Sequence, residues 1–347
     1  MPRWRVAADR LMIQKKFFPG LSFAERQDID RFIELQGGLI FHETEFNRIV
    51  SEVFHTRLFY LVAYHSTGGL KAVCPIHTIK NNFLKLSYSN PAIFEVPYGG
   101  WVYDSKQVQL QDLIRKIPLS MNETLIYWSN LQVEGDEYRQ HFRAVLSVKQ
   151  TAVVDLTQSQ EWIWKSAVHS KRRNMIRKAL KSGVEVEISG SKLYPQYRTM
   201  MVDFNRKTER ESKPAEYYQQ VVDLYFRKKQ AVILLARLGK EILAGIIVVG
   251  NKNFMHYWQG ASQKDAPSLG QGELLQWEAI KWARRNGCRY YDLCVVEPDR
   301  LPQIARFKLG FSRRLAHFYL MNRKTVAFKI ISRFQKLTVG FRKNDHS

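Results

Sequence analysis

The chain contains few cysteines, and their pattern excludes two classes of protein. Its 347 residues include three, Cys74, Cys288 and Cys294. They form neither a closely spaced metal-binding pair nor the even set that a disulfide framework needs. Because their neighbours are apolar, we expect buried, reduced thiols and no metal site. A nucleophilic Cys294 is the less favoured alternative, since no Cys-His-Asp pattern accompanies it.

Long apolar runs are also missing. The longest, residues 242–249, is far too short to span a bilayer, and the N-terminal residues reach no apolar run of signal-peptide length before Lys15. We therefore expect a cytoplasmic protein. Residues 323–347 alternate basic and apolar side chains, a basic amphipathic pattern. This segment is predicted either to contact the inner face of an anionic membrane or to pack on the protein, and both interpretations stay open.

Acidic residues are scarce relative to basic ones. There are 54 Lys and Arg against 32 Asp and Glu, a formal net charge of +22. Such an excess favours an anionic partner: RNA, a nucleotide phosphate, coenzyme A or a membrane surface. For any single cluster a solubilising surface is an equal alternative. The sequence has no helix-turn-helix pattern, zinc-finger spacing or RNP-like aromatic motif, so DNA is not an expected partner.

The order of elements occurs twice, which indicates two domains. A helical pattern, a strand, a glycine-containing turn and a second strand run from residue 43 to 79, and the same order recurs from 217 to 249. The length is comfortable for two cores. Pro75 predicts that the second strand of the first repeat is irregular or lies at an edge. We predict an N-terminal extension (1–24), a first module (25–150), a second module (151–322) and a basic C-terminal segment (323–347).

Residues 169–183 form the most distinctive basic stretch. Apolar or small residues recur at helical spacing on one side, cations occupy the other, and Gly183 stands where a left-handed C-cap belongs. The pattern predicts a helix that holds an anion. Its alternative is an ordinary solvated helix face.

The second half also carries a loop, a strand and a short helix that suggest a site. Residues 268–272 (Ser-Leu-Gly-Gln-Gly) precede a predicted helix over 273–286, so its unpaired first-turn N–H groups form an anion cradle, with an ordinary turn loop as the alternative. Residues 290–296 predict a strand that includes Asp292. Asp299 is expected to N-cap a short helix ending in Phe-Lys-Leu-Gly-Phe at 307–311.

The basic stretch, the Tyr-Asp pair at 291–292 and the Phe-Lys-Leu-Gly-Phe motif together resemble the FemAB-like, or BioF2-like, branch of the GNAT acyltransferase superfamily. The resemblance runs from about residue 41 to 311. It implies an α/β (α+β) fold with two tandem GNAT-like modules, each a mixed, mainly antiparallel sheet flanked by helices.

The resemblance also implies roles for individual residues. Lys308 would stabilise the oxyanion at the reacting carbonyl, and Asp292 would be the base, with Glu297 and His256 as alternatives. Asp292 is equally interpreted as a structural acceptor for a buried hydroxyl or backbone group. The remaining implied residues are Arg172, Arg173, Arg177 and Tyr257 for substrate binding, and Ser268, Gly270 and Gly272 for the coenzyme A pyrophosphate; no metal ligand is implied.

The implied activity is direct attack of an amine on a thioester or ester carbonyl, without a covalent enzyme intermediate. We expect an N-acyltransferase that uses acyl-coenzyme A and a phosphate-bearing amine acceptor from a cell-envelope or exopolysaccharide precursor, working at the cytoplasmic face of the membrane. One alternative is an aminoacyl-tRNA-dependent peptidyltransferase, with tRNA as a partner. Another is a non-catalytic binder of a nucleotide sugar, a lipid headgroup or RNA.

Overall fold

The computed structural model describes residues 11–65, 68–81, 83–90, 92–131, 145–263, 266–325, 327 and 329. The chain divides into two compact units, one from Met1–Val148 and Phe318–Ser347, the other from Lys149–His317. The sequence-based division instead kept the chain up to residue 322 in the second module. Of the predicted amphipathic segment 323–347, residues 326, 328 and 330–347 lie outside the described residues.

The first unit is built on a mainly antiparallel sheet. Its described strands follow the order β1-β2-β3-β4-β6-β13, β5 pairs with β3, and β4 and β6 form a parallel pair. Residues 12–17 of the predicted N-terminal extension belong to this sheet as β1. The elements are β1 (Met12–Phe17), α1 (Phe23–Leu35), α2 (Thr44–Val53), β2 (Arg57–Tyr64), β3 (Leu70–Asn81), β4 (Leu84–Tyr88), β5 (Val102–Tyr103), α3 (Leu110–Arg115), β6 (Glu123–Trp128) and β13 (Leu315–Lys324), which begins in the second unit.

Alternation along β2 gives this sheet two buried faces. Leu58, Tyr60 and Val62 pack with residues of α1, while the intervening Phe59, Leu61 and Ala63 pack with residues of α3. Successive side chains of a strand point to opposite faces, so one apolar run fills two cores. Ser22 and Glu25 form a capping box that starts α1.

Pro75 lies in an interior strand whose pairing is interrupted, so the predicted irregularity is confirmed and the edge alternative is wrong. β3 pairs along one side with β2, where Pro75 is opposite Tyr60. On its other side β3 pairs with β5 at residues 72–73 and with β4 at residues 77–81. Pro75 falls between these two partners, where the missing N–H leaves no ladder hydrogen bond unmade.

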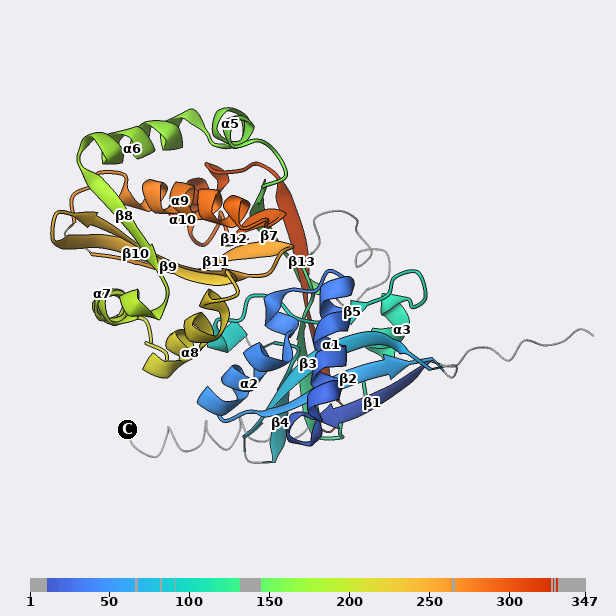
Figure 1. The fold of residues 1–347 in the computed structure, drawn as a ribbon. Coiled ribbons are helices and arrows are strands. Elements are labelled where there is room, and N and C mark those ends of the chain that lie inside the picture. Colours follow the sequence, from blue (N-terminus) through green and yellow to red (C-terminus); the bar gives the residue numbers. More distant parts are fainter. Residues whose placement is uncertain are drawn as a thin grey trace, which may run out of the picture. The chain divides into compact units, whose positions relative to one another are not determined.

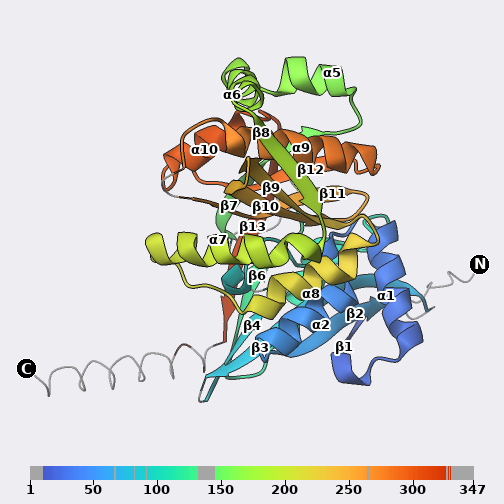
Figure 2. The same ribbon diagram turned by 60° about the vertical axis from the view of Figure 1, so that its left-hand side comes forward.

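The second unit is a six-stranded sheet with helices on both faces. The order is β7-β12-β11-β10-β9-β8, and β11 and β12 form its parallel pair. Helices α6 and α9 lie on one face and α7 and α8 on the other (Figures 1 and 2). The elements are β7 (Val145–Asp155), α5 (Gln160–Trp162), a π-helical turn (Ile163–Ala167), α6 (Ser170–Lys181), β8 (Val184–Ser189), α7 (Tyr194–Lys207), α8 (Ala215–Phe226), β9 (Ala231–Leu238), β10 (Glu241–Gly250), β11 (Phe254–Ser262), α9 (Gln271–Arg285), β12 (Tyr290–Val296) and α10 (Pro302–Leu309).

Local signals in this unit behave as the sequence predicts, with one exception. α6 ends at Lys181, and Gly183 has a φ of 78°, so the left-handed C-cap is confirmed. The exception is the start of α10. Leu301 is the N-cap, its N–H donates to the carbonyl of Glu297, and the predicted capping by Asp299 is wrong. Pro302, which needs no N–H partner, begins the helix instead.

Among the described residues, no helix combines the length and the apolar character needed to cross a bilayer.

Candidate active site

Two neighbouring strands of the second unit depart from regular pairing at the same level. β11 and β12 pair over residues 254–256 and 290–292. Beyond this point the register of β11 against β10 shifts, because Tyr257 faces Val248 while Gln259 faces Ile247. Trp258 is therefore the extra residue of a β-bulge, and its ring packs on those of Tyr217 and Tyr218. The bulge therefore interrupts the regular pairing of β10 with β11 at this level.

A cavity of about 560 Å³ lies against this bulge. Its walls come from α7 and the loop after it, from β10 and β11, from the start of α9 and from the segment between β12 and the end of α10. The residues that line it are Phe204, Arg210, Ala244, Gly245, Ile246, Tyr257, Trp258, Gln259, Gly260, Ala261, Ser262, Gly272, Leu275, Gln276, Cys294, Val295, Glu297, Leu301, Gln303, Ile304, Phe307 and Lys308.

Lys308 and Tyr257, two of the residues expected at the site, meet in this cavity. The Lys308 Nζ donates to the Val295 carbonyl at 2.8 Å and lies 5.9 Å from the centre of the Tyr257 ring. Burial lowers the pKa of Lys308, against the opposing effects of Cys294, Asp292 and Glu297. Burial also raises the pKa of Tyr257 to about 12, so its phenol stays protonated. The motif's second phenylalanine, Phe311, is fully buried.

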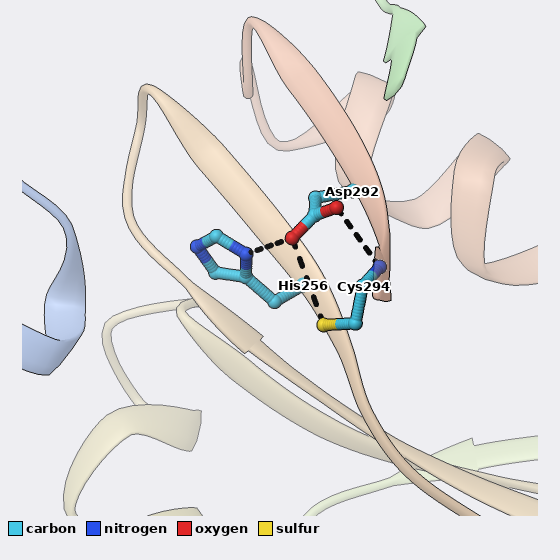
Figure 3. Close-up of side chains that lie close together, drawn as sticks. All are labelled: His256, Asp292 and Cys294. Carbon is cyan, nitrogen blue, oxygen red and sulfur yellow. Dashed lines mark hydrogen bonds and ion pairs between the residues drawn. The ribbon is translucent and has the colours of Figure 1, made fainter. Parts of the chain in front are cut away.

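Asp292 lies beneath the cavity surface and does not line it. Its carboxylate is fully buried and accepts hydrogen bonds from the Thr151 hydroxyl, from the Cys294 N–H at 2.9 Å and from the His256 Nδ1 at 2.7 Å. The Cys294 thiol is 3.6 Å from it (Figure 3). These contacts support the interpretation of Asp292 as a structural acceptor.

The other two candidates for the base differ in access to the cavity. His256 is fully buried against Asp292, whereas Glu297 lines the cavity. The Glu297 carboxylate binds Lys149 at 2.6 Å, and this hydrogen bond, with further help from Arg300, lowers its pKa despite partial burial. Glu297 is therefore ionised at neutral pH.

His256, Asp292 and Cys294 each offer an atom that can bind a metal, and these atoms lie within 4.8 Å of one another. The carboxylate between them already accepts from hydroxyl, backbone, imidazole and thiol donors. A cation would have to displace these donors, so hydrogen bonding accounts for the cluster. Cys74 and Cys288 are buried as expected, but Cys294 is partly exposed to the cavity; no disulfide joins these three described residues.

The predicted coenzyme A loop divides into residues with different surroundings. Gly272 lines the cavity, and a methyl group there would meet only Phe307, at 3.8 Å. Gly270 is the N-cap of α9 with a φ of 93°, and a Cβ there would lie 2.2 Å from the Met175 carbonyl oxygen. Its glycine is thus required by packing against α6. The Ser268 carbonyl accepts from Lys178 at 2.6 Å.

The three arginines of α6 bind other parts of the second unit. Arg172 forms an ion pair with Glu273 at 2.6 Å and lies over the Phe307 ring. Arg173 donates to the carbonyls of residues 164, 165 and 168, and Arg177 contacts Asn174 and the Trp164 ring. None of them is among the described residues that line the cavity.

Arg210 is the cavity cation that the sequence did not indicate. It lies in the loop after α7, its guanidinium is 5.6 Å from the Phe204 ring, and its charge acts against the raised pKa of Tyr257. Residues 206–213 are a mixed charge run without periodicity, so nothing in the sequence separates Arg210 from its neighbours.

Comparisons with known proteins bear on the fold of the unit that holds this cavity. Residues 170–308 match the family model described as an acetyltransferase (GNAT) domain. FemX has a similar structure, with a TM-score of 0.67 at 15% identity over 88% of this chain and 96% of FemX. No curated protein matches the chain at the level of sequence.

Two further solved structures share the fold. The C-terminal domain (DUF2156) of a lysylphosphatidylglycerol synthetase candidate from Agrobacterium fabrum has a TM-score of 0.53 at 14% identity, covering 88% of this chain and 95% of that one. A tandem GNAT protein from the clavulanic acid biosynthesis pathway has a TM-score of 0.50 at 12% identity, covering 90% and 99%. Residues 170–308 thus match a GNAT domain, and the likeness of the whole chain to FemX and to a tandem GNAT protein confirms the predicted tandem GNAT-like fold.

Proposed function

We propose that the protein is an N-acyltransferase that joins an acyl group to an amine of a phosphate-bearing acceptor, a cell-envelope or exopolysaccharide precursor. The observation that carries the proposal is the bulge of β11, which faces a cavity bordered by Lys308 and by the first turn of α9. Backbone N–H groups at a bulge, a cation and a helix N-terminus are the groups that a developing oxyanion and an acyl donor need.

In the proposed reaction a neutral amine attacks the acyl carbonyl directly. The C–N bond forms, the bond to the leaving sulfur or oxygen breaks, and the leaving group departs as an anion or takes a proton. Backbone N–H groups near Tyr257 and the Lys308 ammonium stabilise the oxyanion. Glu297 accepts the amine proton, because it is the ionised carboxylate of the cavity wall.

The acceptor's phosphate provides a reason for a cation at the cavity. Arg210 is suited to this role because its guanidinium can bind two phosphate oxygens at once. Arg172, Arg173 and Arg177 remain proposed substrate contacts, with Arg172 exchanging its Glu273 partner for phosphate. An acceptor of this class places the enzyme in the cytoplasm, at the inner membrane face.

Acyl-coenzyme A is the first candidate donor. Its pyrophosphate would use the first-turn N–H groups of α9, and Gly272 leaves room on the cavity side. One observation favours aminoacyl-tRNA as the second candidate. α6 covers Gly270, and the Glu273 carboxylate already supplies negative charge in the first turn of α9. A donor without a pyrophosphate at this position would meet neither the packing of α6 against Gly270 nor the negative charge of Glu273.

The experiment is to incubate the purified protein with acetyl-coenzyme A, longer acyl-coenzyme A species or aminoacyl-tRNA, together with a panel of phosphate-bearing amines. Products are identified by mass spectrometry, and each donor's binding is read from the melting temperature. Lys308→Met should lower kcat at least about 10²-fold, as loss of an oxyanion donor does. Arg306→Met, an exposed cation on the same helix, is the matched control.

The donor that raises the melting temperature and gives product identifies the reaction. Binding without turnover, unaffected by Lys308→Met, would instead support the non-catalytic binder of a nucleotide sugar or lipid headgroup. Binding of RNA that weakens steeply with salt and involves no transfer would support the RNA-binding alternative.

The acceptor site has its own test. Arg210→Gln should raise KM for a phosphate-bearing acceptor and leave KM for the donor unchanged. Arg206→Gln, in the same charged stretch but 78% exposed and paired with Asp203, is the control. Equal effects of the two variants would remove Arg210 from the acceptor site.

A further inference from the structure

β12 contains an irregular turn directly beside the cavity. Its pairing with β7 shifts register between Asp292 and Val295. Within this shift Cys294 has a φ of 57°, a left-handed conformation that is sterically costly for a residue with a side chain. A strand under no constraint would relax to extended geometry, so surrounding groups must hold the turn.

The Asp292 carboxylate is the group that holds it. One oxygen accepts the Cys294 N–H at 2.9 Å and the Thr151 hydroxyl, and the other is 2.7 Å from the His256 Nδ1 (Figure 3). Thr151 belongs to β7 and His256 to β11, so the carboxylate is anchored from the strands on both sides of β12. The anchored carboxylate in turn fixes the N–H of Cys294.

The turn determines where Lys308 lies. Val295 follows Cys294 directly, and its carbonyl accepts the Lys308 Nζ at 2.8 Å. The direction of that carbonyl depends on the backbone conformation at Cys294. If Cys294 became extended, the acceptor would turn away and the ammonium would lose its position over the Tyr257 ring.

We propose that Asp292 is a positioning residue and not the base: it locks Cys294 in the left-handed conformation, so that the Val295 carbonyl holds the Lys308 ammonium at the reacting carbonyl. The inference rests on the proposed function only in giving Lys308 a role in the reaction. It assigns the Cys294 thiol no chemical role.

Substitutions at Cys294 test whether the left-handed backbone conformation at this residue positions Lys308. Glycine adopts positive φ without steric cost, so Cys294→Gly should keep kcat within about threefold of wild type. Valine is strongly disfavoured there, and Cys294→Val should lower kcat by about 10²-fold, the cost of displacing a catalytic group by about 1 Å, with little change in either KM. Inactive Cys294→Gly in a protein that melts normally would overturn the proposal, because it would show that the thiol itself is needed.

Asp292→Asn separates positioning from base catalysis even if the valine variant fails to fold. The amide keeps an oxygen for the Cys294 N–H, so positioning predicts near-normal kcat on the acid side of the pH profile. A general base predicts a loss of about 10²–10⁴-fold at every pH. That uniform loss, in a variant with normal melting, would overturn the proposal.

If Asp292 positions Lys308, the Asp292→Asn substitution should also shift the alkaline limb of the pH profile of kcat. Around the Lys308 ammonium lie Asp292, Cys294, Glu297 and the Tyr257 ring, and burial lowers the pKa of Lys308 while the first three raise it. Removing the Asp292 charge lowers this pKa further. The alkaline limb of kcat should therefore move to lower pH in Asp292→Asn, and an unmoved limb would contradict the role of Lys308 as a cation.

The NMR resonance of Lys308 reports its position without requiring turnover. It therefore tests the positioning role of Asp292 separately from the proposed function. In protein labelled with ¹³C-lysine, the Lys308 resonance is assigned by its loss in Lys308→Arg. It should be the same in wild type and Cys294→Gly, and shifted in Cys294→Val and Asp292→Ala. If no donor reacts, this pattern still supports the lock, and an unchanged resonance in the last two variants would refute it.

Discussion

The first unit should become less stable in mild acid because of one buried histidine. His77 on β3 is fully buried; its Nε2 is 2.8 Å from the Asn47 Oδ1, and its Nδ1 is 2.7 Å from the Thr56 hydroxyl. The amide oxygen can only accept, so Nε2 carries the proton and Nδ1 accepts from the hydroxyl. Both nitrogens of the neutral ring are thus satisfied, and burial lowers the pKa of His77 to about 3.

The sign and size of the effect follow from linkage. An unfolded histidine has a pKa near 6.5, so between about pH 6.5 and 3 the unfolded chain binds a proton that the folded unit does not. Stability from this group is complete above pH 6.5 and falls as the pH is lowered, by about 1.4 kcal/mol per pH unit. Between pH 7 and pH 5 the expected loss is about 2 kcal/mol.

His77→Gln is a suitable variant, because glutamine offers a donor for Asn47 and an acceptor for Thr56 without titrating. Urea unfolding at pH 7, 6 and 5 should show that wild type loses about 2 kcal/mol more than the variant over this range. Val73→Ala, a buried truncation on the same strand, should reduce stability equally at each pH. Parallel pH dependences for wild type and His77→Gln would refute the reasoning.

Three further predictions concern the second unit. Arg173→Met leaves the carbonyls of residues 164, 165 and 168 without this donor and should lower the free energy of unfolding by about 1–3 kcal/mol, measured by urea unfolding. Gly270→Ala should reduce the melting temperature because a Cβ there meets the Met175 carbonyl, whereas Gly272→Ala should leave it unchanged and weaken only donor binding. Phe311→Ala should cost about 3–5 kcal/mol of stability by opening a cavity in the core, and unchanged urea midpoints would contradict that burial.

Elements specified by local signals could be predicted to within a residue or two. The strand over 290–296 is confirmed at both ends, and Gly239 turns between β9 and β10 with a φ of 60°. These signals are short apolar runs beside glycines, and they act within a few residues. The predicted N-cap at Asp299 is wrong because a helix can begin at any of several neighbouring residues. The choice depended on the hydrogen bond from the Leu301 N–H to the Glu297 carbonyl, which the sequence does not indicate.

Partners of charged side chains were not predictable in the same way. Helical spacing indicated an apolar face of α6, where Ile176 and Ala179 are buried but Leu180 is 57% exposed. It did not indicate that Arg172 would meet Glu273, which is 101 residues away in the chain. A pattern of period 3.6 describes one helix, whereas the partner of a cation depends on which other helix packs beside it.

The same limit explains the site. The sequence indicated Asp292, His256 and Cys294 as separate candidates and did not indicate Thr151. Their convergence depends on the order β7-β12-β11, in which strands far apart in the sequence become neighbours. The left-handed Cys294 and the bulge at Trp258 are irregularities of pairing, and pairing irregularities leave no periodic trace. The residues proposed to act at this site therefore depend on distortions that only the assembled sheet can hold in place.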